Sequence, residues 1–138
     1  MNDPRSTPPS SGGSGPSGDP LPENPPRYPF NPELEISAVR ADEGTRDGGV
    51  VLVDIREPEE LRVAAIAGAM HIPMGELAAR INELEIGEDQ TLALICHTGR
   101  RSLHAAVALH RMGWDQARSV AGGIEWWSLR VDPTVPRY

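Results

Sequence analysis

One segment, residues 92–102 (LALICHTGRRS), places a cysteine where its thiolate could act as a nucleophile. An apolar run ends at Cys96, and a short loop containing Gly99 then leads directly into a segment with helical character. Backbone N–H groups at a helix N-terminus have no partner inside the helix, and together with the helix dipole they favour negative charge. Arg100 and Arg101 add two positive charges. We therefore expect the Cys96 thiol to ionise more readily than a free thiol and to react as a nucleophile.

The alternative is a structural cysteine, because a free cysteine at the end of a buried strand is often simply packed there. Packing alone requires neither a glycine nor two arginines within the next five residues. The pattern therefore favours an anion site built around one thiolate. With Cys96 as the nucleophile, the candidate active-site loop consists of His97, Thr98, Gly99, Arg100, Arg101 and Ser102.

Two further polar residues, Asp54 and Arg56, stand at the end of the expected strand 50–54, which we expect to neighbour the strand of Cys96. Asp54 could pair with Arg101 and hold the loop, or it could form an ordinary strand-end pair or cap. For Asp54 we favour a supporting role over direct chemistry. Arg56 could reach the anion pocket or remain a solvated surface residue.

The four histidines do not form a metal set. His97 lies inside the loop and could tune the thiolate, whereas His71, His104 and His110 are expected to be structural or exposed. One cysteine cannot build a thiolate zinc site. We therefore expect no metal at this site.

Strand and helix patterns alternate from residue 33 onward and must position these residues. Expected strands cover 34–37, 50–54, 69–72, 91–95 and 118–120, and expected helices cover 38–45, a turn beginning at Pro58, 75–84, 102–112 and 123–129. Short strands separated by helices predict an α/β fold with a mainly parallel five-stranded sheet. Sites in such sheets form beyond the carboxyl ends of the strands, where the loops after Asp54 and Ile95 lie.

Composition excludes several classes of function. The chain has 138 residues, enough for one domain, and its net charge of −7 disfavours general binding to nucleic acid or an anionic membrane. All 13 basic residues are arginine, so any anion site must use arginine or backbone N–H groups. No stretch has the length and apolar character of a membrane span or of a secretory signal. One cysteine fits a reducing compartment, and we expect a cytoplasmic monomer.

Residues 1–32 differ in composition from the rest of the chain. They contain ten of the fourteen prolines and a Ser/Gly-rich run. Such a segment has too little apolar surface to offset its ordering entropy, so we expect a disordered tail over 1–32 and a domain over 33–138. A docking tail is the alternative.

Four segments, in order, resemble the rhodanese family. Residues 96–102 fit its active-site pattern of Cys, two residues, Gly, one residue, Arg and Ser. The other three are VLVDIREPEE (51–60), which is similar to its first long strand and acidic turn, IAGAMHIP (66–73), and the GGIEWW segment (122–127), which is similar to its C-terminal signature.

This resemblance implies a three-layer rhodanese-like domain and a sulfurtransferase reaction through a Cys96 persulfide. A small sulfur donor such as thiosulfate would supply the sulfur, and cyanide, a thiol or a sulfur-carrier protein would accept it, without metal or organic cofactor. Two departures stand out: Thr98 and no lysine occupy a loop in which some thiosulfate-specific relatives carry lysine, and Ala65 stands where the family often has histidine. The first leaves the natural donor open.

Two other functions compete with sulfur transfer. Dual-specificity phosphatases and arsenate reductases are related alternatives, but the phosphatases use five residues between Cys and Arg, whereas four separate Cys96 from Arg101. A shorter loop predicts a smaller cradle, suited to one sulfur rather than a tetrahedral oxyanion. A rhodanese-like carrier or regulatory binding module is the other alternative, and many such modules lack the cysteine that this chain retains.

Overall fold

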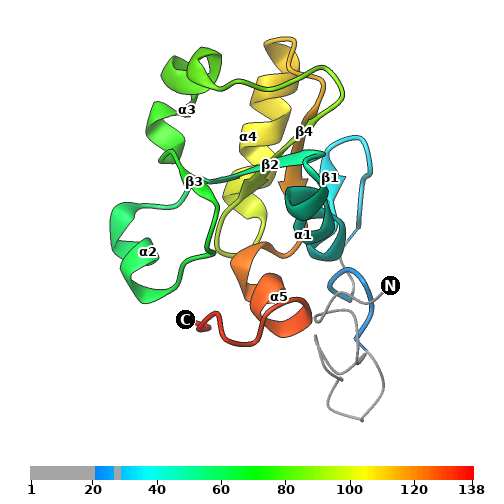
Figure 1. Ribbon diagram of the computed structural model, residues 1–138, viewed down its shortest axis with the longest axis vertical. Helices are drawn as coiled ribbons and strands as arrows, with labels where there is room; N and C mark the ends of the chain where they lie inside the picture. The colour runs from blue at the N-terminus through cyan, green and yellow to red at the C-terminus, as the bar shows by residue number, and fades with distance from the viewer. Residues whose placement is uncertain (1–20, 27–28) are drawn as a thin grey trace.

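A computed structural model describes residues 21–26 and 29–138. Its five strands form one sheet in the order β1-β5-β4-β2-β3, and every pair of neighbours is parallel (Figure 1). The strands are β1 (Glu35–Ile36), β2 (Val50–Asp54), β3 (Met70–His71), β4 (Thr91–Ile95) and β5 (Ala117–Val120). The α/β class and the parallel five-stranded sheet are therefore confirmed.

Four helices connect successive strands: α1 (Ala38–Asp47), α2 (Pro58–Val63), α3 (Met74–Arg80), which is followed by the 3-10 turn η1 (Ile81–Glu83), and α4 (Arg100–Arg111). A fifth helix, α5 (Gly123–Arg130), follows β5. The apolar runs of β2 and β4 were predicted with the observed bounds. The helix expected over 75–84 is divided into α3 and η1. The strand expected over 34–37 is shorter because the Ser37 side chain caps α1, accepting from Arg40 N at 3.1 Å.

The central strands are buried on both faces, which explains their continuous apolar sequences. Alternate residues point to opposite sides: Leu52 and Ala93 join the core with α1 and α5, whereas Val53 and Leu94 join the core with α3 and α4. This alternation produces three layers, with the sheet in the middle. Cys96 belongs to the second core, directly beyond the end of β4.

Part of the expected tail lies outside the described residues, namely 1–20 and 27–28. Residues 21–26 differ from the expectation because they contact the domain. Leu21 packs against the core, Trp126 Nε1 donates to the carbonyl of Glu23 at 2.9 Å, and Ser37 Oγ donates to the Glu23 carboxylate at 2.5 Å. None of the described helices combines the length and apolar character needed to cross a membrane.

Candidate active site

The Cys96 sulfur lies between the end of β4 and the start of α4, and only 1% of the residue is exposed. Two backbone N–H groups donate to Sγ: Gly99 at 3.2 Å and Ser102 at 3.3 Å. The Ser102 hydroxyl lies 3.3 Å from the same sulfur. The sequence prediction of a sulfur surrounded by hydrogen-bond donors thus agrees with the geometry.

The helix N-terminus explains why these donors are available. Helix α4 begins at Arg100, and the residue before it, Gly99, has no side chain that could cap the first turn. The Ser102 N–H is one of the N–H groups that a capping side chain would satisfy, and the Cys96 sulfur accepts it instead. Gly99 adopts φ +100°, a left-handed conformation that lets the loop turn its amide toward the sulfur.

A second buried hydroxyl supports the first. Ser119 on β5 is fully buried, lies 2.7 Å from Ser102 Oγ and donates to the Gly99 carbonyl at 3.4 Å. Ser119 was absent from the sequence-based site. The signal available in the sequence was a serine within the short strand predicted over 118–120.

The N-terminus of α5 donates hydrogen bonds to the start of the loop that contains Cys96. Ile124 N donates to the Cys96 carbonyl at 2.8 Å, and Glu125 N donates to the His97 carbonyl at 3.0 Å. Gly123 has φ +62°, and a Cβ there would lie 2.4 Å from the His97 oxygen and 2.6 Å from the Cys96 oxygen. A glycine is therefore required for α5 to approach the loop this closely.

We expect Gly123→Ala to destabilise the fold by about 2–4 kcal/mol, because strain at positive φ adds to a backbone clash. The loop carbonyls would also lose their donors, so alkylation of Cys96 should change as well. Urea unfolding measures the stability, and Gly75→Ala in α3 is the matched control, since its Cβ would meet nothing within 4 Å. Equal stability of the two variants would contradict this account of the close approach.

Asp54 forms the strand-end pair that was the alternative to a pair with Arg101, whereas Arg56 occupies neither of the places considered for it. Asp54 binds Arg56 rather than Arg101, with Nε–Oδ1 at 2.9 Å and Nη2–Oδ2 at 2.7 Å. Arg56 is 0% exposed and is therefore not a solvated surface residue, and the N–H groups that donate to the Cys96 sulfur come from Gly99 and Ser102 rather than from Arg56. Side chains two residues apart share one side of an extended chain, so the guanidinium folds back onto its own strand.

Arg56 is instead a buried residue whose hydrogen bonds connect several segments of the chain. It also donates to the Ala64 carbonyl at 2.7 Å and to the Tyr138 hydroxyl oxygen at 2.9 Å. Burial opposes its charge, but the hydrogen bonds to Asp54 and Tyr138 outweigh that effect, and its pKa is raised. Arg56 thus joins β2, the end of α2 and the C-terminal segment.

Arg101 has a different partner, Glu60 of α2. The pair is bidentate, with Nη1–Oε1 at 2.8 Å and Nη2–Oε2 at 2.9 Å. The hydrogen bonds from Arg101 are the main reason why the pKa of Glu60 is lowered to about 2. The pKa of Arg101 is raised, chiefly by the hydrogen bonds to Glu60, with a contribution from the charge of Cys96. Glu60 was missed as a site residue, although it stands in the acidic turn 57–60.

This pair makes a testable contribution to acid stability. Because the pKa of Glu60 is lowered on folding, the contribution is present above its usual value near 4.5 and is lost as pH falls toward 2. Glu60→Gln should therefore be less stable than the parent at pH 7, by about 1 kcal/mol or less because the pair is partly exposed, and equally stable near pH 2. Denaturation at several pH values measures the difference. A difference that is independent of pH would contradict the assignment.

Tyr138 covers the loop from the other side. Its ring stacks on His97 with centroids 3.9 Å apart and an interplanar angle of 6°, and its main-chain oxygen lies 2.9 Å from His97 Nε2. Its hydroxyl donates to Glu60 Oε2 at 2.8 Å. Burial is the main cause of the raised pKa of Tyr138. The sequence offered no signal for this residue, which comes from the C-terminal segment that runs from α5 toward α2 (Figure 1).

The remaining candidates are placed less centrally. Thr98 and Arg100 are exposed, and the ring contacts of His97 are with Tyr138. His71 and His110 bind main-chain oxygens, in agreement with the structural role expected of them. Among the described residues, no cluster of His, Cys, Asp and Glu could hold a metal ion.

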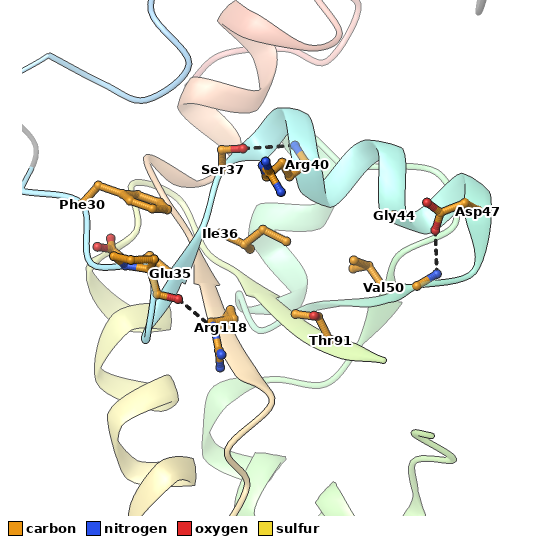
Figure 2. A pocket seen from close by; sticks show the side chains of 12 residues that line it. Phe30, Glu35, Ile36, Ser37, Arg40, Gly44, Asp47, Val50, Thr91 and Arg118 are labelled. Atoms are coloured by element: carbon orange, nitrogen blue, oxygen red, sulfur yellow. Dashed lines mark hydrogen bonds between the residues drawn. The ribbon is translucent and has the colours of Figure 1, made fainter. Parts of the chain in front are cut away.

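A pocket of about 550 Å³ lies away from the sulfur (Figure 2). It is bordered by α1, β1 and the N-terminal ends of β2 and β4, and its lining includes Phe30, Glu35 and Arg118. The Arg118 guanidinium that faces it is bound to the carbonyl of Pro32 at 3.1 Å. Because Cys96 lies at the opposite ends of these strands, we place the active site there and not in this pocket.

Comparisons with known proteins identify the family of this chain. The model of the rhodanese-like domain matches residues 37–130. The putative sulfur carrier protein YrkF of Bacillus subtilis is 36% identical over 101 residues, which are 73% of this chain and 53% of YrkF, so the chain spans about half of that relative. The structure of the human single-domain sulfurtransferase TSTD1 is 30% identical with a TM-score of 0.58, covering 67% of this chain and 93% of that one. A Rhodopseudomonas palustris protein described as a possible tyrosine phosphatase is 26% identical with a TM-score of 0.60, covering 76% and 84%.

Proposed function

This chain belongs to the rhodanese-like domain family, and from that premise we propose that it transfers sulfane sulfur through a persulfide on Cys96. The observation that carries the proposal is the buried Sγ that accepts N–H groups from Gly99 and Ser102 at a helix N-terminus. Fixed donors of this kind stabilise negative charge on sulfur without reorganising during the reaction. The sulfurtransferase and sulfur-carrier names of relatives support the same chemistry.

The proposed reaction has two displacement steps. In the first, the Cys96 thiolate attacks the sulfane sulfur of a donor, the bond between that sulfur and the rest of the donor breaks, and the donor leaves with the electron pair. The leaving group is sulfite from thiosulfate, a thiolate from an organic persulfide, or the enolate of pyruvate when the donor sulfur is the thiol of mercaptopyruvate. In the second step a thiol, cyanide or a sulfur-carrier protein attacks the outer sulfur of the Cys96 persulfide, and the Cys96 thiolate is released. Neither step requires a metal or an organic cofactor.

Mass spectrometry of the intact protein tests the first step. Incubation with thiosulfate, mercaptopyruvate or a low-molecular-mass persulfide should add one sulfur atom to Cys96, the one cysteine in the chain. Adding a thiol afterwards should remove this sulfur atom from Cys96. If no donor adds sulfur under conditions in which the protein is folded, the proposal is wrong.

A stoichiometric carrier or regulatory module is the second candidate, and the name of the YrkF relative favours it. The two functions differ in turnover. A sulfurtransferase converts many equivalents of donor and acceptor, whereas a carrier accepts one sulfur and releases it only to its partner. Product yield per protein molecule therefore distinguishes them.

Phosphatase activity is less well supported by the geometry. The loop between Cys96 and Arg101 has four residues, and the Arg101 guanidinium that would bind a phosphoryl group is occupied by Glu60. We expect no hydrolysis of an aryl phosphate above the Cys96→Ser background.

The use of a free thiolate also favours a reducing compartment such as the cytoplasm.

A further inference from the structure

Three arginines on the segments around the Cys96 loop are each paired with a carboxylate. Arg56 is bound to Asp54, Arg101 to Glu60, and Arg137 to Glu125. Arg100 is exposed, and the exposed carboxylates of Glu57 and Glu59 stand in the same turn as Glu60. The three pairs named here are each neutral, and the sequence supplies no lysine.

Glu60 is the residue that creates this balance next to the sulfur. The charge of Cys96 contributes to the raised pKa of the Arg101 guanidinium. Glu60 binds both terminal nitrogens of that guanidinium and neutralises its charge.

Glu60 is also fixed in place by other contacts. The Tyr138 hydroxyl donates to Oε2 at 2.8 Å, and Glu57 N donates to Oε1 at 3.1 Å in the capping box of α2. Its side chain is 21% exposed. The carboxylate is therefore held by three groups, so its departure would break several bonds at once.

We propose that Glu60 is a specificity-determining residue, which neutralises Arg101 beside Cys96 and makes the site prefer sulfur donors of low negative charge, such as alkyl persulfides, over the thiosulfate dianion. This inference rests on the proposed sulfurtransferase function. Its physical basis is electrostatic. A dianion that approaches Cys96 meets a neutral Arg101–Glu60 pair and the exposed carboxylates of Glu57 and Glu59, whereas a donor without net charge experiences little repulsion.

The variant that tests this is Glu60→Gln. Glutamine keeps the capping box, which accepts either Glu or Gln at this position, and it removes only the charge. Glu59→Gln is the matched control, because it removes the same charge from the same helix but leaves the Arg101 pair intact.

Two sulfur donors provide the first measurement. We expect Glu60→Gln to raise kcat/KM for thiosulfate about tenfold, mainly through a lower KM, and to change kcat/KM for cysteamine persulfide, which has little net charge, by less than about threefold. Glu59→Gln should change either value by less than about threefold. The inference is wrong if Glu60→Gln raises kcat/KM equally for both donors. It is also wrong if Glu60→Gln raises kcat/KM for thiosulfate no more than Glu59→Gln does.

A second measurement does not depend on sulfur transfer. Cys96 is the one thiol, so its alkylation by anionic iodoacetate and neutral iodoacetamide reports charge selection directly. The ratio of the two rates cancels the fraction of thiolate. It should increase about three- to tenfold in Glu60→Gln and remain near the parent value in Glu59→Gln. An unchanged ratio overturns the inference even if sulfur transfer is established, and an increased ratio without any sulfur transfer supports the charge selection while refuting the function.

Discussion

Cys96→Ser is expected to abolish sulfur transfer, with a loss of at least about 10³-fold in kcat. A serine oxygen can accept the N–H groups of Gly99 and Ser102, but it cannot hold a sulfane sulfur in a persulfide. No second cysteine exists that could replace it. The measurement is sulfur release to cyanide or to a thiol from each donor.

The fold of this variant should remain intact. Serine is smaller than cysteine and is hydrogen-bonded at this position, so unfolding by urea should change by no more than about 1–2 kcal/mol. A folded Cys96→Ser protein that still transfers sulfur would refute the persulfide mechanism. A variant that fails to fold would be replaced by Cys96→Ala, for which the same loss of transfer is expected.

Asp54→Ala should have the largest effect on stability, a loss of about 3–5 kcal/mol, because it leaves the charge of Arg56 buried without its carboxylate. Arg56 is 0% exposed and binds both oxygens of Asp54. The remaining oxygens that it contacts are the main-chain carbonyls of Ala64 and Glu60 and the Tyr138 hydroxyl, and all three are uncharged. Chemical denaturation measures the loss.

Two comparisons make this prediction specific. Asp89→Ala removes an exposed aspartate and should change stability by less than about 0.5 kcal/mol. The double variant Asp54→Ala, Arg56→Met removes both charges and should regain a large part of the lost stability, since an apolar replacement of a buried pair costs little. A double variant that is less stable than Asp54→Ala would show that the buried charge is not the cause.

The sequence by itself determined the elements that depend on neighbouring residues. The mainly apolar runs 50–54 and 91–95 gave strands with the observed bounds, because burial on both faces of a parallel sheet favours a continuous run of apolar side chains. The loop after Cys96 was also predictable, since the strand end, Gly99 and the start of α4 lie within a few residues. The placement of the sulfur beside unpaired N–H groups follows from that local order.

Only the tertiary structure decided the charge pairs. The sequence was compatible with an ion pair between Arg101 and Asp54, but in the structure Arg101 binds Glu60, which is 41 residues away in sequence. Arg56 and Tyr138 meet across 82 residues. Which carboxylate reaches which guanidinium depends on how α2, α4 and the C-terminal segment are positioned over the sheet edge, and sequence spacing carries no information on that distance. The reactive sulfur is thus specified by local chain order, whereas the charge that a donor meets there is specified by long-range packing.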